Sequence, residues 1–174
     1  MSELSKTSLV AKARRTAEQY SSGEDRPLGG YLAGIAVYSS LTTGLGLLAR
    51  AQRRPLPSPT PFEVLLLAAA THKLTRLITK ESITSAIRAP FTEYKGVAGP
   101  AELHEEVRGE GVRHAVGELV TCPFCLAQWT ATGFTYGLIF APRATRLVAL
   151  ALATVAGSDW LQLGYAWAQH KAMG

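Results

Sequence analysis

The chain has 174 residues, a length that suits one domain. Its formal net charge is +5 and its hydrophobic content is 47%. Two cysteines cannot form a disulfide scaffold, and the first 27 residues lack the apolar stretch of a cleavable signal peptide. The basic residues flank apolar segments and do not form a stripe with interleaved aromatics, which argues against nucleic acid as a partner.

Residues 1–27 form a polar, basic leader, in which residues 8–20 are predicted to be a short helix. The first apolar segment, residues 28–49, contains 22 residues and no charge, enough to cross a bilayer as a helix. It is rich in small residues, with Gly30 and Gly34 in a GxxxG pattern that lets neighbouring helices approach closely. This segment is the first predicted transmembrane helix.

After a stiff proline-rich connector, residues 62–79 form the second apolar segment, which also contains Glu63, His72, Lys73 and Arg76. We interpret it as a second span, because Glu63 lies at one end and the two cations lie near the other, where long side chains can reach the membrane surface. The alternative is an amphipathic helix of a soluble domain.

The loop of residues 80–119 holds most of the acidic residues. Ile83, Ile87 and Phe91 are spaced four apart, which predicts an amphipathic helix in the membrane interface. Residues 101–108 are predicted to form a short acidic helix.

Residues 120–141 carry no charge, and residues 147–168 carry only Asp159, so both are predicted to span the membrane. A carboxylate in a span must find a partner or a proton. His72 and Arg76 lie at a similar predicted depth, and Arg76 is the favoured partner because its guanidinium is always charged. The alternative places Asp159 in the interface, against water or headgroups.

The distribution of Lys and Arg sets the orientation of these four predicted spans. Eleven lie in the two tails and the 80–119 loop, and five lie in the connectors on the opposite side. By the positive-inside rule, both termini are expected to face the cytoplasm, with the protein in the inner or plasma membrane.

Cys122 and Cys125 form a Cys-Pro-Phe-Cys motif at the start of the third span, with three interpretations. They could be a redox pair, since a helix N-terminus favours the thiolate. They could supply two zinc ligands, completed by a second copy of the chain. The third interpretation is structural packing. On a cytoplasmic face the thiols are expected to be reduced.

Two motifs resemble a family of small bacterial membrane proteins of unknown function that includes spore-associated members. The first is Cys-Pro-Phe-Cys with Trp129 four residues later, similar to that family's CPWC-x-x-x-W signature, although Phe124 replaces its tryptophan. The second is an acidic-Ser-Ile element followed by R-x-P-F. The residues that match the motifs are Glu81, Ser82, Arg88, Pro90, Phe91, Pro123 and Trp129. The resemblance covers roughly residues 62–169 and implies a multi-pass helical protein.

The sequence therefore predicts an all-α integral membrane protein with four transmembrane helices and one interfacial helix. No hydrolase, metalloprotease or phosphate-loop motif is present, so the favoured function is a non-enzymatic anchor or assembly partner. Its partners would be the lipid bilayer and either another protein or a second copy, without a cofactor. The alternative function is thiol redox or metal binding by Cys122 and Cys125, with zinc as the metal.

Overall fold

The computed structural model describes residues 11–12, 15–16, 19–20 and 26–173, so most of the predicted leader lies outside the described residues. Its elements are α2 (Leu28–Ala51), α3 (Pro61–Thr79), the 3₁₀ turn η1 (Ser82–Thr84), α4 (Ser85–Arg88), β1 (Thr92–Gly99), β2 (Glu102–Val107), α5 (Gly111–Thr121), α6 (Pro123–Phe140) and α7 (Pro142–Met173). The fold is mostly helical, as predicted, with a small antiparallel two-stranded sheet in addition.

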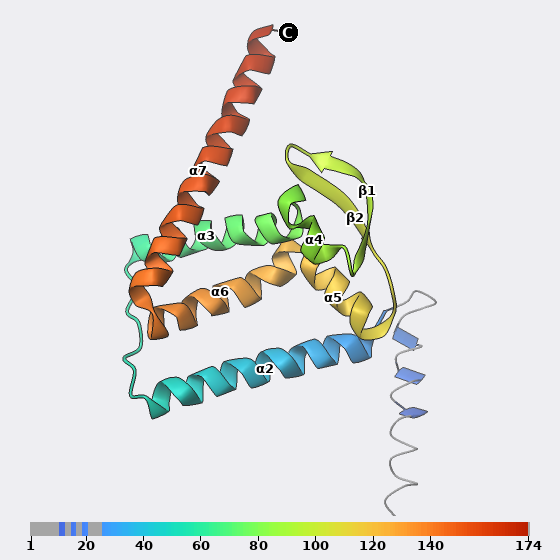
Figure 1. Cartoon of the computed structure of the whole chain (residues 1–174), viewed down its shortest axis with the longest axis vertical. Helices are drawn as coiled ribbons and strands as arrows, with labels where there is room; N and C mark the ends of the chain where they lie inside the picture. Colours follow the sequence, from blue (N-terminus) through green and yellow to red (C-terminus); the bar gives the residue numbers. More distant parts are fainter. Residues whose placement is uncertain (1–10, 13–14, 17–18, 21–25, 174) are drawn as a thin grey trace, which may run out of the picture.

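Helices α2, α3 and α6 run side by side, and α7 packs on α3 and α6, with its C-terminal half projecting from the body (Figure 1). Helix α6 contacts α2, α3 and α7, while α3 packs along α7. Small residues allow the close crossing: Ala70 and Ala149 are fully buried together with Phe134 at the centre of the core. The core of the described residues is therefore the meeting point of α3, α6 and α7.

The structure gives each of the four apolar segments a helix, but among the described residues only two helices, α2 and α7, are long and apolar enough to cross a membrane. By length and composition, the structure therefore supports two of the four predicted spans. Helix α3 carries charges along its length, and α6 begins only at Pro123 and contains Gln128 and three threonines, which lower its hydropathy.

The 80–119 region differs most from expectation. Most of the predicted helix at residues 101–108 is instead strand β2, Glu102–Val107, because Leu103, Glu105 and Val107 alternate inward with period two. Ala101, at φ 61°, closes the turn to β1. The predicted interfacial helix is reduced to η1 and the single turn α4, and Ile83 and Ile87 remain exposed. We call the end of α3, η1, α4, β1 and β2 the cap.

Candidate functional site

A cavity of about 630 Å³ lies between α3, α7 and the turn of the hairpin. Charged and aromatic side chains from elements far apart in sequence line it: His72, Lys73, Arg76, Glu81, Glu102, Asp159 and Trp160. The four polar residues singled out from the sequence, at positions 72, 76, 81 and 159, therefore meet in one place. We call this the charged pocket.

Lys73 is the centre of the charged pocket. Its side chain is only 11% exposed, and its Nζ contacts Asp159 Oδ2 at 2.9 Å and also contacts Glu81. Burying an ammonium group is unfavourable unless it is paired, so two carboxylates from different elements stabilise it there. Asp159 is 45% exposed, which leaves it open to solvent as well.

The predicted partners of Asp159 have other contacts. Arg76 Nη2 pairs with Glu102, on the second strand of the hairpin. The ring of His72 stacks on Trp160, with centroids 6.2 Å apart. The prediction that Arg76 or His72 binds Asp159 is corrected accordingly: Lys73 lies closer to α7 and takes the carboxylate, and the hairpin supplies a separate acid for Arg76.

The charged pocket combines three carboxylates with two permanent cations, so its groups largely neutralise one another. Each carboxylate accepts from a cation, and the three come from the start of η1, from β2 and from α7. The arrangement therefore ties three elements to α3. It is suited to holding the hairpin and α7 in place, and it presents no activated nucleophile.

A second, buried group lies below the charged pocket, around Arg88. Arg88 is 0% exposed and pairs through Nε with Glu105, whose side chain is 6% exposed. Its Nη1 donates to the Ile78 carbonyl and to Thr84 Oγ1, both at 2.7 Å, and Nη2 donates to the Glu81 carbonyl at 3.1 Å. Four of its five N–H donors are used for contacts within the cap, so Arg88 has a structural role.

The remaining residues of the second motif continue the cap. Ser82 begins η1 and its carbonyl accepts from the Ser85 amide. The Pro90 carbonyl accepts from Arg113 Nε at 3.0 Å, which joins the cap to α5. The Phe91 carbonyl accepts from the Arg108 amide at 2.9 Å, at the base of the hairpin. These motif residues build backbone connections and do not line the charged pocket.

Lys80 lies just beyond α3 and is partly buried. Burial lowers its pKa below the ordinary value of 10.5, and the nearby positive charges of Arg76 and Arg88 lower it further. Its carbonyl accepts from the Leu103 amide at 2.8 Å. The backbone of Lys80 thus joins α3 to β2, while burial and two neighbouring cations destabilise the charged form of its ammonium group.

The cysteine motif opens α6. Cys122 is the N-cap residue, its Sγ accepts from the Cys125 amide at 3.1 Å, and Pro123 occupies the first turn. Cys122 and Cys125 form a disulfide with Cα atoms 5.3 Å apart, so the prediction of reduced thiols is wrong for this structure. Among the described residues, no three side chains of His, Cys, Asp or Glu gather as a metal site would require.

Trp129 of the same motif packs edge-on against Tyr38, with ring centroids 5.1 Å apart. The Tyr38 hydroxyl lies 2.7 Å from Thr132 Oγ1 and accepts from Gln128 Nε2 at 2.6 Å. This motif therefore attaches α2 to α6.

Sequence reasoning missed Lys73 and Glu102 as members of the charged pocket. The signal for Lys73 was present, because any charge within an apolar segment requires a partner, and Lys73 obeys the same rule as Arg76. Glu102 could not be placed while residues 101–108 were taken as a helix.

The described structure is a mostly helical protein with two apolar helices long enough to cross a membrane and a small hairpin cap. The family model described as "Protein of unknown function (DUF1360)" matches residues 66–165, and the chain belongs to this family. The sporulation protein YjcA of Bacillus subtilis (strain 168) is 32% identical over 110 residues, which cover 57% of this chain and 93% of that protein. No solved structure matches the chain. A bacterial family of unknown function with a sporulation relative is what the two motifs predicted.

Proposed function

We propose that the chain is an integral membrane protein that acts as a non-enzymatic anchor or assembly partner in a membrane complex. The observation that carries this proposal is the outward-facing apolar surface of α2 and α7. In the most apolar 18-residue stretch of each helix, only 6% of α2 and 11% of α7 is buried within the structure. A core helix of a soluble protein would be mostly buried, whereas lipid or a partner would cover such surfaces.

In this proposal the protein is multi-pass, and the shorter helices α3 and α6 cross beside α2. The pairing of Lys73, Arg76 and Asp159 within the charged pocket supports it, because polar side chains at membrane depth need partners of their own. The excess of Lys and Arg in the tails and the cap side, eleven against five, supports a cytoplasmic location of both termini in this proposal.

The assembly role rests on the C-terminal half of α7, which projects from the body (Figure 1). It exposes Leu161, Tyr165 and Trp167, and Trp167 also carries Lys171 over its ring at 4.8 Å. An apolar helix presented in this way can pack against a helix of another membrane protein or of a second copy. The name of the relative points to sporulation as the process in which such an assembly is to be sought.

Membrane insertion is tested by washing membranes with carbonate and by labelling single cysteines introduced into each tail of a variant that lacks Cys122 and Cys125. We expect the protein to stay in the pellet and both tails to be protected from impermeant reagents added outside the cell. Release by carbonate would refute the membrane proposal, and labelling of either tail from outside would refute the orientation.

Assembly is tested by measuring the protein mass of detergent-solubilised complexes with light scattering. We expect Leu161→Ser with Trp167→Ser to reduce that mass to one chain, whereas Leu32→Ser in α2 leaves it unchanged. Both positions are exposed apolar sites, so the comparison isolates the α7 surface. A mass of one chain already in the unmodified protein, with no second protein present, would refute the assembly role.

A second function, thiol–disulfide exchange, is favoured by the Cys122–Cys125 disulfide in the first turn of α6. Cys125 is exposed and lines a cavity of about 520 Å³ between α2, α5 and α6. A substrate thiolate would attack one sulfur, form a mixed disulfide and release the other cysteine as a thiolate. The second thiol of the substrate would then attack the mixed disulfide. This step forms a disulfide in the substrate and leaves both cysteines reduced. Binding of zinc would likewise need the reduced pair.

The redox proposal is tested by trapping thiols in cells with an alkylating reagent that adds mass. Exchange predicts a mixture of oxidised and reduced chains that shifts on reductant treatment, and a mixed disulfide in the Cys125→Ser variant. A fully reduced pair that never forms a mixed disulfide would refute it, and a Cys122→Ser, Cys125→Ser variant that retains the assembly would favour the anchor role.

A further inference from the structure

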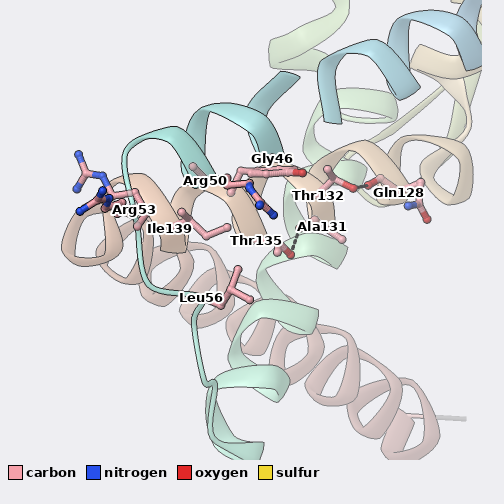
Figure 2. A pocket seen from close by; sticks show the side chains of 12 residues that line it. Gly46, Arg50, Arg53, Leu56, Gln128, Ala131, Thr132, Thr135 and Ile139 are labelled. Atoms are coloured by element: carbon pink, nitrogen blue, oxygen red, sulfur yellow. Dashed lines mark hydrogen bonds between the residues drawn. The ribbon is translucent and has the colours of Figure 1, made fainter. Parts of the chain in front are cut away.

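A cavity of about 840 Å³ lies between the C-terminal half of α2, the connector and α6, far from the charged pocket along the chain. Figure 2 shows Arg50 over this space from the end of α2, Leu56 facing it from the connector, and Arg53 at its outer edge. Ala131, Thr135 and Ile139 of α6 form the other wall. The cavity is thus apolar along its length and basic at one end.

The arginines at this end, Arg50, Arg53 and Arg54, have no acidic partner. None forms an ion pair within the part of the chain that the structure describes, and Arg54 donates only to Gln52, at 3.1 Å. The sequence has no Asp or Glu at positions 26–62 or 119–158. Glu63, the acid that follows the connector, is already paired with Arg146 at 2.7 Å. Three arginines therefore line one end of the cavity, and none of them has an ion-pair partner among the described residues.

A second cavity of about 850 Å³ lies between the connector, α3 and α6. It shares Gln128, Ala131 and Thr135 with the first, so the two cavities adjoin along one face of α6. Val64, Leu67 and Phe134 are among the apolar residues that line the second cavity. Together the cavities offer two mostly apolar spaces next to one basic end, and the second is also lined by His72 and Arg76 of the charged pocket.

We propose that this groove binds one anionic phospholipid, with its phosphate at Arg50, Arg53 and Arg54 and one acyl chain in each cavity; the proposal rests on the membrane location proposed above. Arginine forms paired hydrogen bonds with phosphate, and the end of α2 lies where a helix would meet the headgroup layer. A free anion would leave both apolar cavities unfilled, and a neutral lipid would leave three cations unpaired.

The test uses the full chain purified in neutral detergent and measures lipid retention by native mass spectrometry, together with the thermal shift. The probes are phosphatidylglycerol, phosphatidylcholine with the same acyl chains, and glycerol phosphate, which has the anion without the chains. We expect phosphatidylglycerol to bind at least tenfold more tightly than the other two, since charge-assisted bonds add to chain burial. Equal binding of the two lipids would overturn the proposal, and so would binding of glycerol phosphate as tight as that of phosphatidylglycerol.

Two variants locate the site. Arg50→Gln with Arg53→Gln should abolish the preference for phosphatidylglycerol, whereas Arg143→Gln should preserve it. Arg143 is an exposed cation at the start of α7 and does not line the cavity, so it controls for net charge. Ala131→Leu should weaken the binding of both lipids, because Ala131 lines both cavities and a larger side chain there would occupy their space. The thermal midpoint without lipid verifies that each variant is folded, and an unchanged preference in the double variant would refute the site.

The failure of this proposal is distinguishable from failure of the membrane proposal. A protein that resists carbonate extraction but shows no lipid preference is a membrane protein without this site. A protein that carbonate releases overturns both.

Discussion

The buried pair of Arg88 and Glu105 gives the sharpest test of the cap. In Arg88→Met, the Glu105 carboxylate, 6% exposed, would lose its cation, and the carbonyls of Ile78 and Glu81 would lose their donors. Breaking one half of a buried ion pair costs about 3–5 kcal/mol. For a chain of this length, that corresponds to a decrease of roughly 6–20 °C in the midpoint of thermal unfolding.

The assay is thermal unfolding of Arg88→Met, Glu105→Met and the double variant in one detergent. We expect the double variant to be more stable than Arg88→Met alone, because the second change removes the unpaired carboxylate. Lys95→Ala is the control: Lys95 pairs with Glu93 at 3.2 Å on the exposed hairpin, so its midpoint should stay unchanged. A loss below about 1 kcal/mol for Arg88→Met, or strictly additive losses, would refute the structural role derived above.

Three further predictions concern helix contacts and pH. Gly30→Ala should cost roughly 1–3 kcal/mol in unfolding free energy, because its new Cβ would lie 2.7 Å from the Ala115 Cβ, whereas Gly34→Ala has open space and should be neutral or up to about 1 kcal/mol stabilising. A double-mutant cycle of Lys73→Met and Asp159→Asn should give a coupling of roughly 0.2–1 kcal/mol, because Asp159 is half exposed, and a coupling of zero would contradict this contact between α3 and α7. The pKa of Lys80 is lowered in the folded state, so the folded chain binds fewer protons than the unfolded chain between that pKa and 10.5. The charged Lys80 therefore destabilises the folded state. This destabilisation is fully present below the folded-state pKa and disappears as the pH rises to 10.5. Lys80→Met should therefore raise the unfolding midpoint at pH 7, and its advantage should shrink towards pH 10; a pH-independent difference would contradict the assignment.

The helices could be predicted from the sequence because apolar runs and prolines are local signals. Pro61, Pro123 and Pro142 each occupy the first turn of a helix, where proline is favoured. Whether a helix is apolar enough to span a membrane was harder to predict, since the threonines of α6 count against it without breaking the run.

The hairpin was missed because its second strand, β2, is short and strongly acidic. The acidic residues Glu105 and Glu106 favour the interpretation of a solvated helix, and only the alternation around Leu103 and Val107 indicates a strand. The charged pocket was partly predictable, as the charges of α3 and α7 had to be paired within the protein. Which cation pairs with which acid could not be predicted, because that choice depends on the crossing of α3 and α7 and on the position of the hairpin.

The connections within the cap have a consequence for the order in which the chain folds. Arg88 reaches Ile78 and Glu105 across 10 and 17 residues, and Arg76 reaches Glu102 across 26. The side chains that attach α2 to α5 and α6 bridge 87 to 94 residues. Closing short loops costs less entropy, so the cap orders during synthesis soon after residue 105 emerges, while α2 waits for α6. The matched family region, residues 66–165, leaves out α2, so it holds the early-folding cap without this late-docking helix.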